Sequence, residues 1–351
     1  MAYQLNKKIR DLKPYDPVDG NYLIRLDANE SFLPVPDKVQ NKIMEAVTNT
    51  SFNRYPDSKA AQLCKSFAGY YGVNPENVTA GNGSDELISI ICGAFLMKGD
   101  TIVTLSPDFS MYKFYASITE ASCMEYPKKP DLTIDVDELI SFVNRYQAKM
   151  LLFSNPCNPT SLGLKKEEVR KLIASVKALV ILDEAYMDFW DQSLLNEVER
   201  YDNLIILRTC SKAFGMAAIR LGFAIANPVL SNALKAVKSP YNVNAVTQKI
   251  GEALLNEPQL IHDSILKIKE SVQNLYEALI KIESEYPGEM HVYPSVANFV
   301  LIRLEEAKDV YLKLLDKGIA VRFMGDFLRV SAGSQNENRE FLKVFQNAIS
   351  V

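Results

Sequence analysis

Residues 204–226 read LIILRTCSKAFGMAAIRLGFAIA, two apolar runs separated by a polar loop. The loop contains Lys212, and Arg220 follows eight residues later. Apolar runs without alternation are typical of strands that helices cover on both faces. A lysine beside such strands is costly to bury unless its surroundings are arranged for it. The stretch therefore predicts a buried sheet and raises the question of what Lys212 does.

Similar apolar runs recur between about residues 75 and 226: TIVTL (101–105), KMLLF (149–153), ALVILD (178–183), LIILR (204–208) and FAIA (223–226). Amphipathic stretches with helical spacing lie between them, which predicts an α/β domain with a parallel sheet. After about residue 240, long helical patterns and short strands predict a smaller α+β unit. We expect residues 1–35 to form an arm and part of the small domain, residues 36–239 the large domain, and residues 240–351 the small domain.

Composition excludes several classes of function. The formal net charge is −4 and shows no basic excess, so we expect no nucleic-acid partner. No signal peptide is recognisable, and no apolar run approaches the ~20 residues that a membrane helix needs. The five cysteines form no C-x-x-C pair, which favours reduced thiols in a cytoplasmic protein. With only two histidines, a zinc site or a Ser-His-Asp triad is disfavoured, and we expect no metal.

Polar residues gather where four of the predicted strands end, one of which is a further strand that ends near Ala80. These segments are GNGSDE (81–86), SNPCNPTS (154–161), DEAY (183–186) and TCSK (209–212). In open α/β sheets, ligands bind outside the carboxyl ends of the strands. We therefore expect these four segments to meet around one ligand.

Each segment has a plain structural reading and a chemical one. Free N–H groups at Ser84 and Asp85 suit a phosphate, although GNGSDE could be only a capped turn. Asp183 could cap a helix or hold a proton on a ring nitrogen, which Tyr186 could also reach. Lys212, near the cation of Arg220, could be a neutral amine that attacks a carbonyl, and Arg220 could bind a phosphate bidentately. Together they describe an aldehyde, a phosphate and a basic ring nitrogen, which is pyridoxal 5′-phosphate.

The chain resembles the aspartate-aminotransferase fold family of pyridoxal-phosphate enzymes and, more narrowly, the histidinol-phosphate aminotransferases. The matching stretches are, in order, LDANE, NRYPD, GNGSDELI, SPDFSMY, NPCNPT, LDEAYMDF, RTCSKAF, IRLGF, VANFVLIRL and FLRVS. They run from residue 26 to residue 333, nearly the whole chain. The resemblance implies a large domain with a mostly parallel seven-stranded sheet covered by helices, and a smaller α+β domain.

The resemblance also implies site residues. It makes Lys212 the covalent anchor and proton carrier, with Asp183 on the ring nitrogen and Tyr186 on the ring hydroxyl. Its cofactor-binding residues are Ser84, Asp85, Phe109, Asn158, Asp183, Tyr186, Ser211, Lys212, Arg220 and, from the neighbouring subunit of a homodimer, Tyr55. Its substrate-binding residues are Arg329, Arg322 and Asn29.

The reaction that the resemblance implies is transamination between histidinol phosphate and 2-oxoglutarate, a step of histidine biosynthesis. An aromatic or other amino acid aminotransferase and a threonine-phosphate decarboxylase remain alternatives on the same cofactor. A nicotinamide dehydrogenase would leave Lys212, Asp183 and Arg220 unexplained, and its fingerprint lacks the third glycine. A non-catalytic ligand-binding module would leave the lysine unexplained.

Three departures from the family pattern concern the substrate side more than the reaction type. Phe109 replaces a tyrosine that stacks on the cofactor ring, so stacking is kept and a hydroxyl is lost. Ser161 replaces the glycine of NPTG. The turn before Arg220 reads MAA, where the family usually has glycine.

Overall fold

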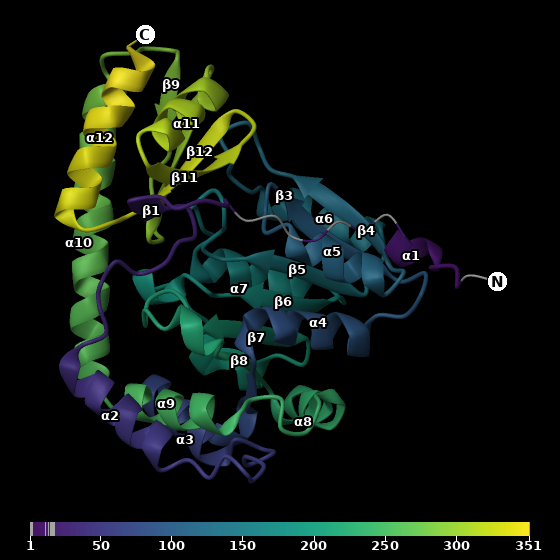
Figure 1. The fold of residues 1–351 in the computed structure, drawn as a ribbon. Coiled ribbons are helices and arrows are strands. Elements are labelled where there is room, and N and C mark those ends of the chain that lie inside the picture. Colours follow the sequence, from purple (N-terminus) through teal and green to yellow (C-terminus); the bar gives the residue numbers. More distant parts are fainter. Residues whose placement is uncertain (1–2, 11, 13, 15–17, 351) are drawn as a thin grey trace.

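The computed structural model describes residues 3–10, 12, 14 and 18–350, which build two domains around separate sheets (Figure 1). Part of the predicted N-terminal arm, namely residues 1, 2, 11, 13 and 15–17, lies outside the described residues. Among the residues that are described, none of the helices combines the length and the apolar character that crossing a membrane requires.

The larger sheet confirms the predicted α/β class. Within the described chain its seven strands follow the order β2 (Val78–Gly81), β8 (Gly222–Ala226), β7 (Leu204–Thr209), β6 (Leu179–Asp183), β5 (Met150–Ser154), β3 (Thr101–Ser106) and β4 (Ser122–Pro127). In this sheet only β8 runs opposite to the other strands, so its pairs with β2 and β7 are antiparallel and the remaining pairs are parallel. The sheet is mostly parallel, as predicted, and FAIA is the strand that departs from the parallel direction. A parallel return usually needs an α-helix, whereas the loop from β7 to β8 contains only the 3₁₀ turn η4 (Ala217–Ile219).

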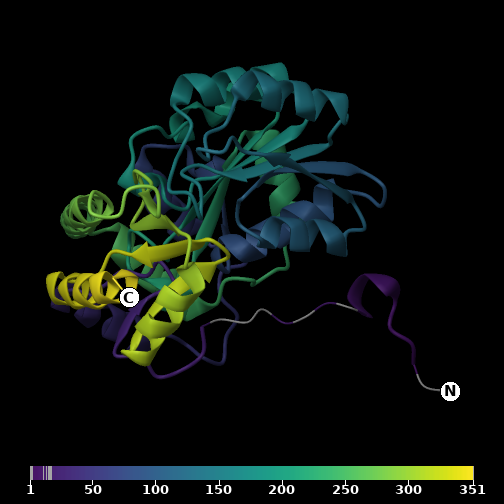
Figure 2. The same ribbon diagram turned by 90° about the horizontal axis from the view of Figure 1, so that it is seen from above.

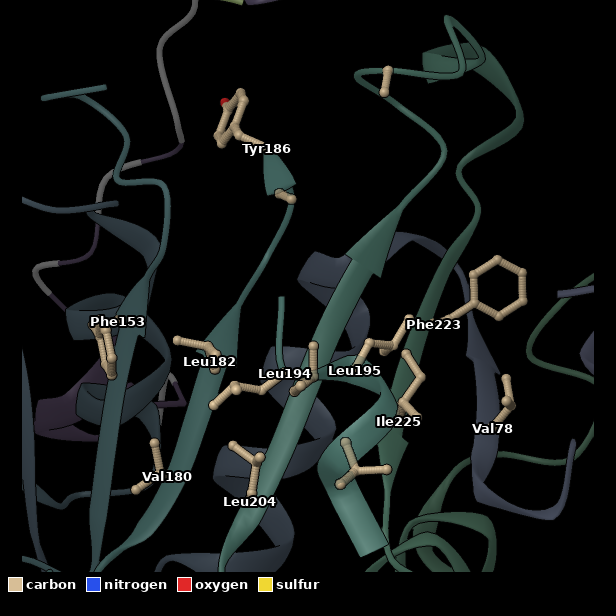
Figure 3. Close-up of a cluster of buried hydrophobic side chains, with 14 of the residues drawn as sticks. Val78, Phe153, Val180, Leu182, Tyr186, Leu194, Leu195, Leu204, Phe223 and Ile225 are labelled. Carbon is tan, nitrogen blue, oxygen red and sulfur yellow. The ribbon is translucent and has the colours of Figure 1, made fainter. Parts of the chain in front are cut away.

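Both faces of this sheet are buried, which explains the unbroken apolar runs. On β5, Leu151 and Phe153 belong to one core, while Met150 and Leu152 belong to the other. Figure 3 shows Leu182 and Leu204 on neighbouring strands of the first core. That core includes side chains of α3 (Ala61–Tyr71), α6 (Val136–Arg145), α7 (Lys166–Ser175) and α9 (Ala245–Leu255); the second includes those of α4 (Gly83–Phe95), α5 (Met111–Ile118) and α8 (Pro228–Val237).

The smaller domain is also as predicted, with helices against a mostly antiparallel sheet. Its strands follow the order β1 (Ile24–Leu26), β11 (Ile319–Met324), β12 (Phe327–Ser331), β10 (Phe299–Leu304) and β9 (Met290–Val292). Its core includes side chains of α10 (Pro258–Glu283), α11 (Ala307–Asp316) and α12 (Gln335–Ile349). The long helix α10 runs along both domains in Figure 1.

The segments near the predicted boundaries join the two domains. β1 lies in the small sheet, parallel to β11. In contrast, α1 (Lys7–Arg10) contacts α5, where Lys8 Nζ donates to the carbonyl of Ile118 at 3.1 Å. Figure 2 shows α1, in purple, at the side of the large domain. Helix α9 packs on α2 (Asp37–Thr48) and α3. The division at residues 35 and 239 stays a prediction. Short 3₁₀ turns complete the fold: η1 (Pro75–Asn77), η2 (Met187–Phe189) and η3 (Leu195–Arg200).

Candidate active site

A cavity of about 390 Å³ lies at the carboxyl ends of the parallel strands and is closed on one side by the small domain. This volume is typical of a small-molecule site. The structure brings together in its lining every predicted site residue except Tyr55: Asn29, Ser84, Asp85, Phe109, Asn158, Asp183, Tyr186, Ser211, Lys212, Arg220, Arg322 and Arg329. The four polar segments that we expected to meet do so.

Lys212 lies in the loop after β7, and its Nζ donates to the carbonyl of Ala28 at 2.8 Å. Burial lowers the pKa of Lys212 to about 8, and the cation of Arg329 adds to this. Arg220 contributes less than Arg329, although the sequence pointed to Arg220. A substantial fraction of the amine is therefore neutral near physiological pH, as a nucleophile requires.

Asp183 ends β6 with a side chain that is only 4% exposed. Its Oδ1 accepts the N–H of Ala185 at 3.1 Å, and its Oδ2 accepts the hydroxyl of Tyr112 at 2.8 Å. Burial raises the pKa of Asp183 to about 7. Such a carboxylate is stabilised by a protonated ring nitrogen, so the site favours a cationic partner.

A phosphate cradle forms where α4 begins. The N-cap residue, Asn82, makes no side-chain capping bond, so the first N–H groups of the helix are open to an anion. Arg220 Nη1 donates to Ser211 Oγ at 3.3 Å, and its Nη2 lies 3.5 Å from Asp85 Oδ2. A Cβ on Gly83 would lie 2.7 Å from Arg220 Nη2, so glycine is needed for this approach. The phosphate cradle, the amine of Lys212 and the carboxylate of Asp183 fit, respectively, the phosphate, the aldehyde and the ring nitrogen of pyridoxal phosphate.

Arg329, on β12, connects the two domains at the cavity. Its Nη1 donates to Asn158 Oδ1 at 2.6 Å, and its Nη2 donates to the carbonyl of Asp27 at 2.5 Å. Arg322, on β11, is its cross-strand neighbour. Two guanidinium groups thus face one cavity, which suits an anionic group of a substrate.

Asn29 approaches from the segment after β1. Its Nδ2 donates to the hydroxyl of Tyr186 at 2.9 Å, and its N–H donates to Ser331 Oγ at 2.9 Å. Figure 3 shows Tyr186 beyond the end of β6, above the apolar layer of the sheet. The contact fixes the tyrosine hydroxyl at the junction of the two domains.

Tyr55 lies outside the cavity lining. Its side chain is 82% exposed, and its ring stacks on that of Tyr241 with a centroid distance of 4.6 Å. Donation of its hydroxyl to a site in a neighbouring subunit stays a prediction.

One of the departures from the family pattern, Ser161, lies in the left-handed backbone region. Ser161 has φ 59° and is fully buried, and its Oγ donates to the carbonyl of Pro294 at 3.1 Å. This bond to the small domain offsets part of the strain that glycine would avoid. In the turn before Arg220, the residues with a left-handed backbone are Gly215 and Arg220 itself. The MAA segment therefore has no position that requires glycine. Phe109 keeps its place in the lining, with its ring 5.4 Å from that of Tyr112.

The sequence analysis missed several residues of the site. Tyr112 and Asp27 are the clearest, although both lie in stretches that carry the resemblance, SPDFSMY and LDANE. A hydroxyl three residues after Phe109, on the first turn of α5, was the available signal for Tyr112. A cluster of three or more His, Cys, Asp or Glu that could hold a metal ion is absent from the described residues.

Comparison with known proteins gives consistent matches. Residues 21–345 match the family described as aminotransferase class I and II. The chain is 42% identical over 341 residues to the histidinol-phosphate aminotransferase of Clostridium novyi, covering 96% of this chain and 94% of that protein. The histidinol-phosphate aminotransferase of Sinorhizobium meliloti, solved with pyridoxal-5′-phosphate, superposes with a TM-score of 0.90 at 22% identity, covering 100% of this chain and 98% of that one. That of Clostridium acetobutylicum gives a TM-score of 0.85 at 27% identity, covering 94% and 100%.

Proposed function

We propose that this chain, which belongs to the aminotransferase class I and II family and within it to the histidinol-phosphate aminotransferases, transfers the amino group of histidinol phosphate to 2-oxoglutarate with pyridoxal 5′-phosphate as cofactor. The observation that carries the proposal is one cavity in which Lys212, Asp183, a phosphate cradle and two further arginines meet. A nicotinamide dehydrogenase would leave Lys212, Asp183 and Arg220 unexplained.

When bound, pyridoxal phosphate supplies a carbonyl that captures an amine and a ring that takes up the electron pair left when the α-proton departs. Lys212 holds the cofactor and, once released, moves the α-proton as general base and acid, which its lowered pKa permits. Asp183 keeps a proton on the ring nitrogen and so favours that electron flow. Ser84, Asp85, Ser211 and Arg220 hold the phosphate, and Asn158 and Tyr186 hold the ring hydroxyl.

The substrate side is proposed from charge and position. Arg329 and Arg322 lie on the small-domain wall, away from the phosphate cradle, so a second anion can be held at the same time. Histidinol phosphate carries such an anion, and 2-oxoglutarate carries two. Asn29 positions Tyr186 through its Nδ2 and accepts the hydroxyl of Ser331, two residues after Arg329, at its Oδ1.

We also propose a homodimer in which Tyr55 reaches the phosphate of the partner's cofactor. The outward ring of Tyr55, stacked on Tyr241, supports this arrangement. The five free cysteines support a reducing, cytoplasmic setting.

The experiment is a panel of amino donors with 2-oxoglutarate, following glutamate formation and the absorbance of the bound cofactor. We expect histidinol phosphate to give the highest kcat/KM, and Lys212→Ala to lose at least about 10²-fold in kcat. Lys98→Ala, at an exposed position, is the matched control. Preferred turnover of phenylalanine or tyrosine, or carbon dioxide release from threonine phosphate, would overturn the substrate assignment.

A further inference from the structure

Tyr112 makes a contact that the proposed reaction does not yet use. It lies on the first turn of α5, its side chain is 1% exposed, and it lines the cavity. Its hydroxyl donates to Asp183 Oδ2 at 2.8 Å, across 71 residues of sequence. The strand β3 and the helix that follows it therefore deliver a hydrogen-bond donor to the carboxylate that ends β6.

Asp183 depends on such donors because its surroundings disfavour its charge. Within the described residues it forms no ion pair, and its carboxylate accepts only the Tyr112 hydroxyl and the Ala185 N–H. The titratable groups that face it are Asp85 on α4, Asp108 before α5, Tyr112 on α5 and Tyr186 after β6. Burial and the two aspartates raise the pKa of Asp183, whereas the Tyr112 hydrogen bond lowers it.

A half-buried tyrosine, Tyr71, shows the contrast. Tyr71 donates its hydroxyl to Asp188 Oδ1 at 2.7 Å, a bond of the same kind outside the cavity lining. Asp188 also pairs with Arg208 at 2.8 Å, so its charge has a cationic partner already. Asp183 lacks that support, and the hydroxyl of Tyr112 is its one side-chain donor in the described part of the chain.

We propose that Tyr112 is a positioning residue for the cofactor ring. Its hydroxyl holds the carboxylate of Asp183 in one orientation and in the ionised form that accepts a hydrogen bond from a protonated ring nitrogen. The inference rests on the proposed pairing of Asp183 with that nitrogen. Because Tyr112 acts through Asp183, its loss weakens ring binding most where Asp183 is close to taking up a proton.

The test uses the apoenzyme and two unreactive ligands. Pyridoxine 5′-phosphate has the ring nitrogen and the phosphate but an alcohol in place of the aldehyde, so it does not react with Lys212. Its 1-deaza analogue has carbon in place of the ring nitrogen. Dissociation constants for both are measured between pH 6 and 9 for the wild type, Tyr112→Phe and Tyr71→Phe, with urea unfolding to verify that each variant is folded.

We expect Tyr112→Phe to bind pyridoxine 5′-phosphate about tenfold more weakly at pH 7, and the deaza analogue within about twofold of the wild type. Affinity for the nitrogen-containing ligand falls as pH falls through the pKa of Asp183, which is about 7. In Tyr112→Phe this fall moves to higher pH, because the removed bond had favoured the ionised form. Tyr71→Phe keeps the wild-type pH profile.

The outcomes separate the two ideas. If the wild type binds both ligands equally, the pairing of Asp183 with the ring nitrogen is wrong. If the wild type prefers the nitrogen-containing ligand and Tyr112→Phe keeps that preference and its pH profile unchanged, the role of Tyr112 is wrong. If Tyr71→Phe shifts the pH profile as much as Tyr112→Phe does, the shift reflects a general loss of stability, and the proposal is wrong.

Discussion

At the scale of single residues, charge in a buried setting decides what each group can do. Lys212 has a pKa of about 8 because it is buried, and because Arg329 lies near it. Arg329 is itself held by Asn158 Oδ1 and the carbonyl of Asp27. The arginine that favours a neutral lysine is therefore fixed by the backbone of one domain and a side chain of the other.

Replacing that cation should change how the apoenzyme captures its cofactor. In Arg329→Gln the pKa of Lys212 rises toward its ordinary value of 10.5, so less amine is neutral at pH 8. We expect the rate of covalent capture of pyridoxal phosphate at pH 8 to fall by up to about tenfold, and its rise with pH to move upward. Arg303→Gln, on an exposed position of β10, is the control. An unmoved pH profile would mean that Arg329 does not lower the pKa of Lys212.

Arg208 shows the cost of removing one partner from a buried cluster. It is 4% exposed and pairs with Glu184 and Asp188, each at 2.8 Å. Arg208→Leu leaves two buried carboxylates without their cation, so we expect the free energy of unfolding to fall by about 3–5 kcal/mol. Lys98→Met, which breaks an exposed pair with Glu120, should leave the free energy of unfolding close to that of the wild type in the same urea titrations, because solvent screens the pair. Similar losses in both variants would contradict this reasoning.

At the scale of elements, the phosphate cradle depends on how closely β8 meets α4. Gly222 pairs with Gly81 at the end of β2 and with Thr209 at the end of β7. A Cβ at Gly222 would lie 2.5 Å from the backbone nitrogen of Ser84. Glycine therefore lets the strand bring Arg220 and the first N–H groups of the helix to one anion.

Gly222→Ala should force the strand and the helix apart. We expect it to destabilise the protein by about 1–3 kcal/mol and to weaken pyridoxal phosphate binding, because the backbone has to move at the cradle. Gly93→Ala is the matched control in α4, where a Cβ meets nothing within 4 Å and should stabilise by about 0.5–1 kcal/mol. Thermal unfolding and cofactor titration measure both. Wild-type cofactor affinity in Gly222→Ala would show that the cradle tolerates the displacement.

At the scale of the whole molecule, the site lies between two domains and faces a proposed partner. β1 carries the segment with Asp27 and Asn29 from the small sheet to the cavity, and Arg322 and Arg329 come from the same sheet. Tyr55 is exposed and lies outside the lining of its own cavity. We propose that a complete site takes residues from two subunits.

Mixed dimers test that arrangement. Lys212→Ala lacks the lysine, and Tyr55→Ala lacks the proposed phosphate contact, so each alone should show low activity at limiting cofactor. A heterodimer of the two has one native site, and random mixing at equal amounts should restore about a quarter of the wild-type activity. Activity no greater than the average of the two separate variants would show that Tyr55 serves its own subunit or none.

The sequence by itself determined the α/β class, the buried strands and most of the residues that we propose for the cofactor site. Strands covered on both faces are continuously apolar. The ends of such strands, or the few residues after them, contain Ser84, Asn158, Asp183 and Lys212. The edge strand β4 was missed because its side chains are mostly exposed or half-buried, so it carries no apolar run.

Only the tertiary structure decided which groups act on one another. Arg329 contacts the carbonyl of Asp27 across 302 residues and Asn158 across 171, and Tyr112 reaches Asp183 across 71. No local pattern encodes these pairs, because they depend on the order of β6, β5 and β3 in the large sheet, the placing of β1 in the small sheet, and the closure of one domain on the other. The residue types at the strand ends indicated which chemistry the site can perform. The packing of distant segments determined the charge state of its ionisable groups.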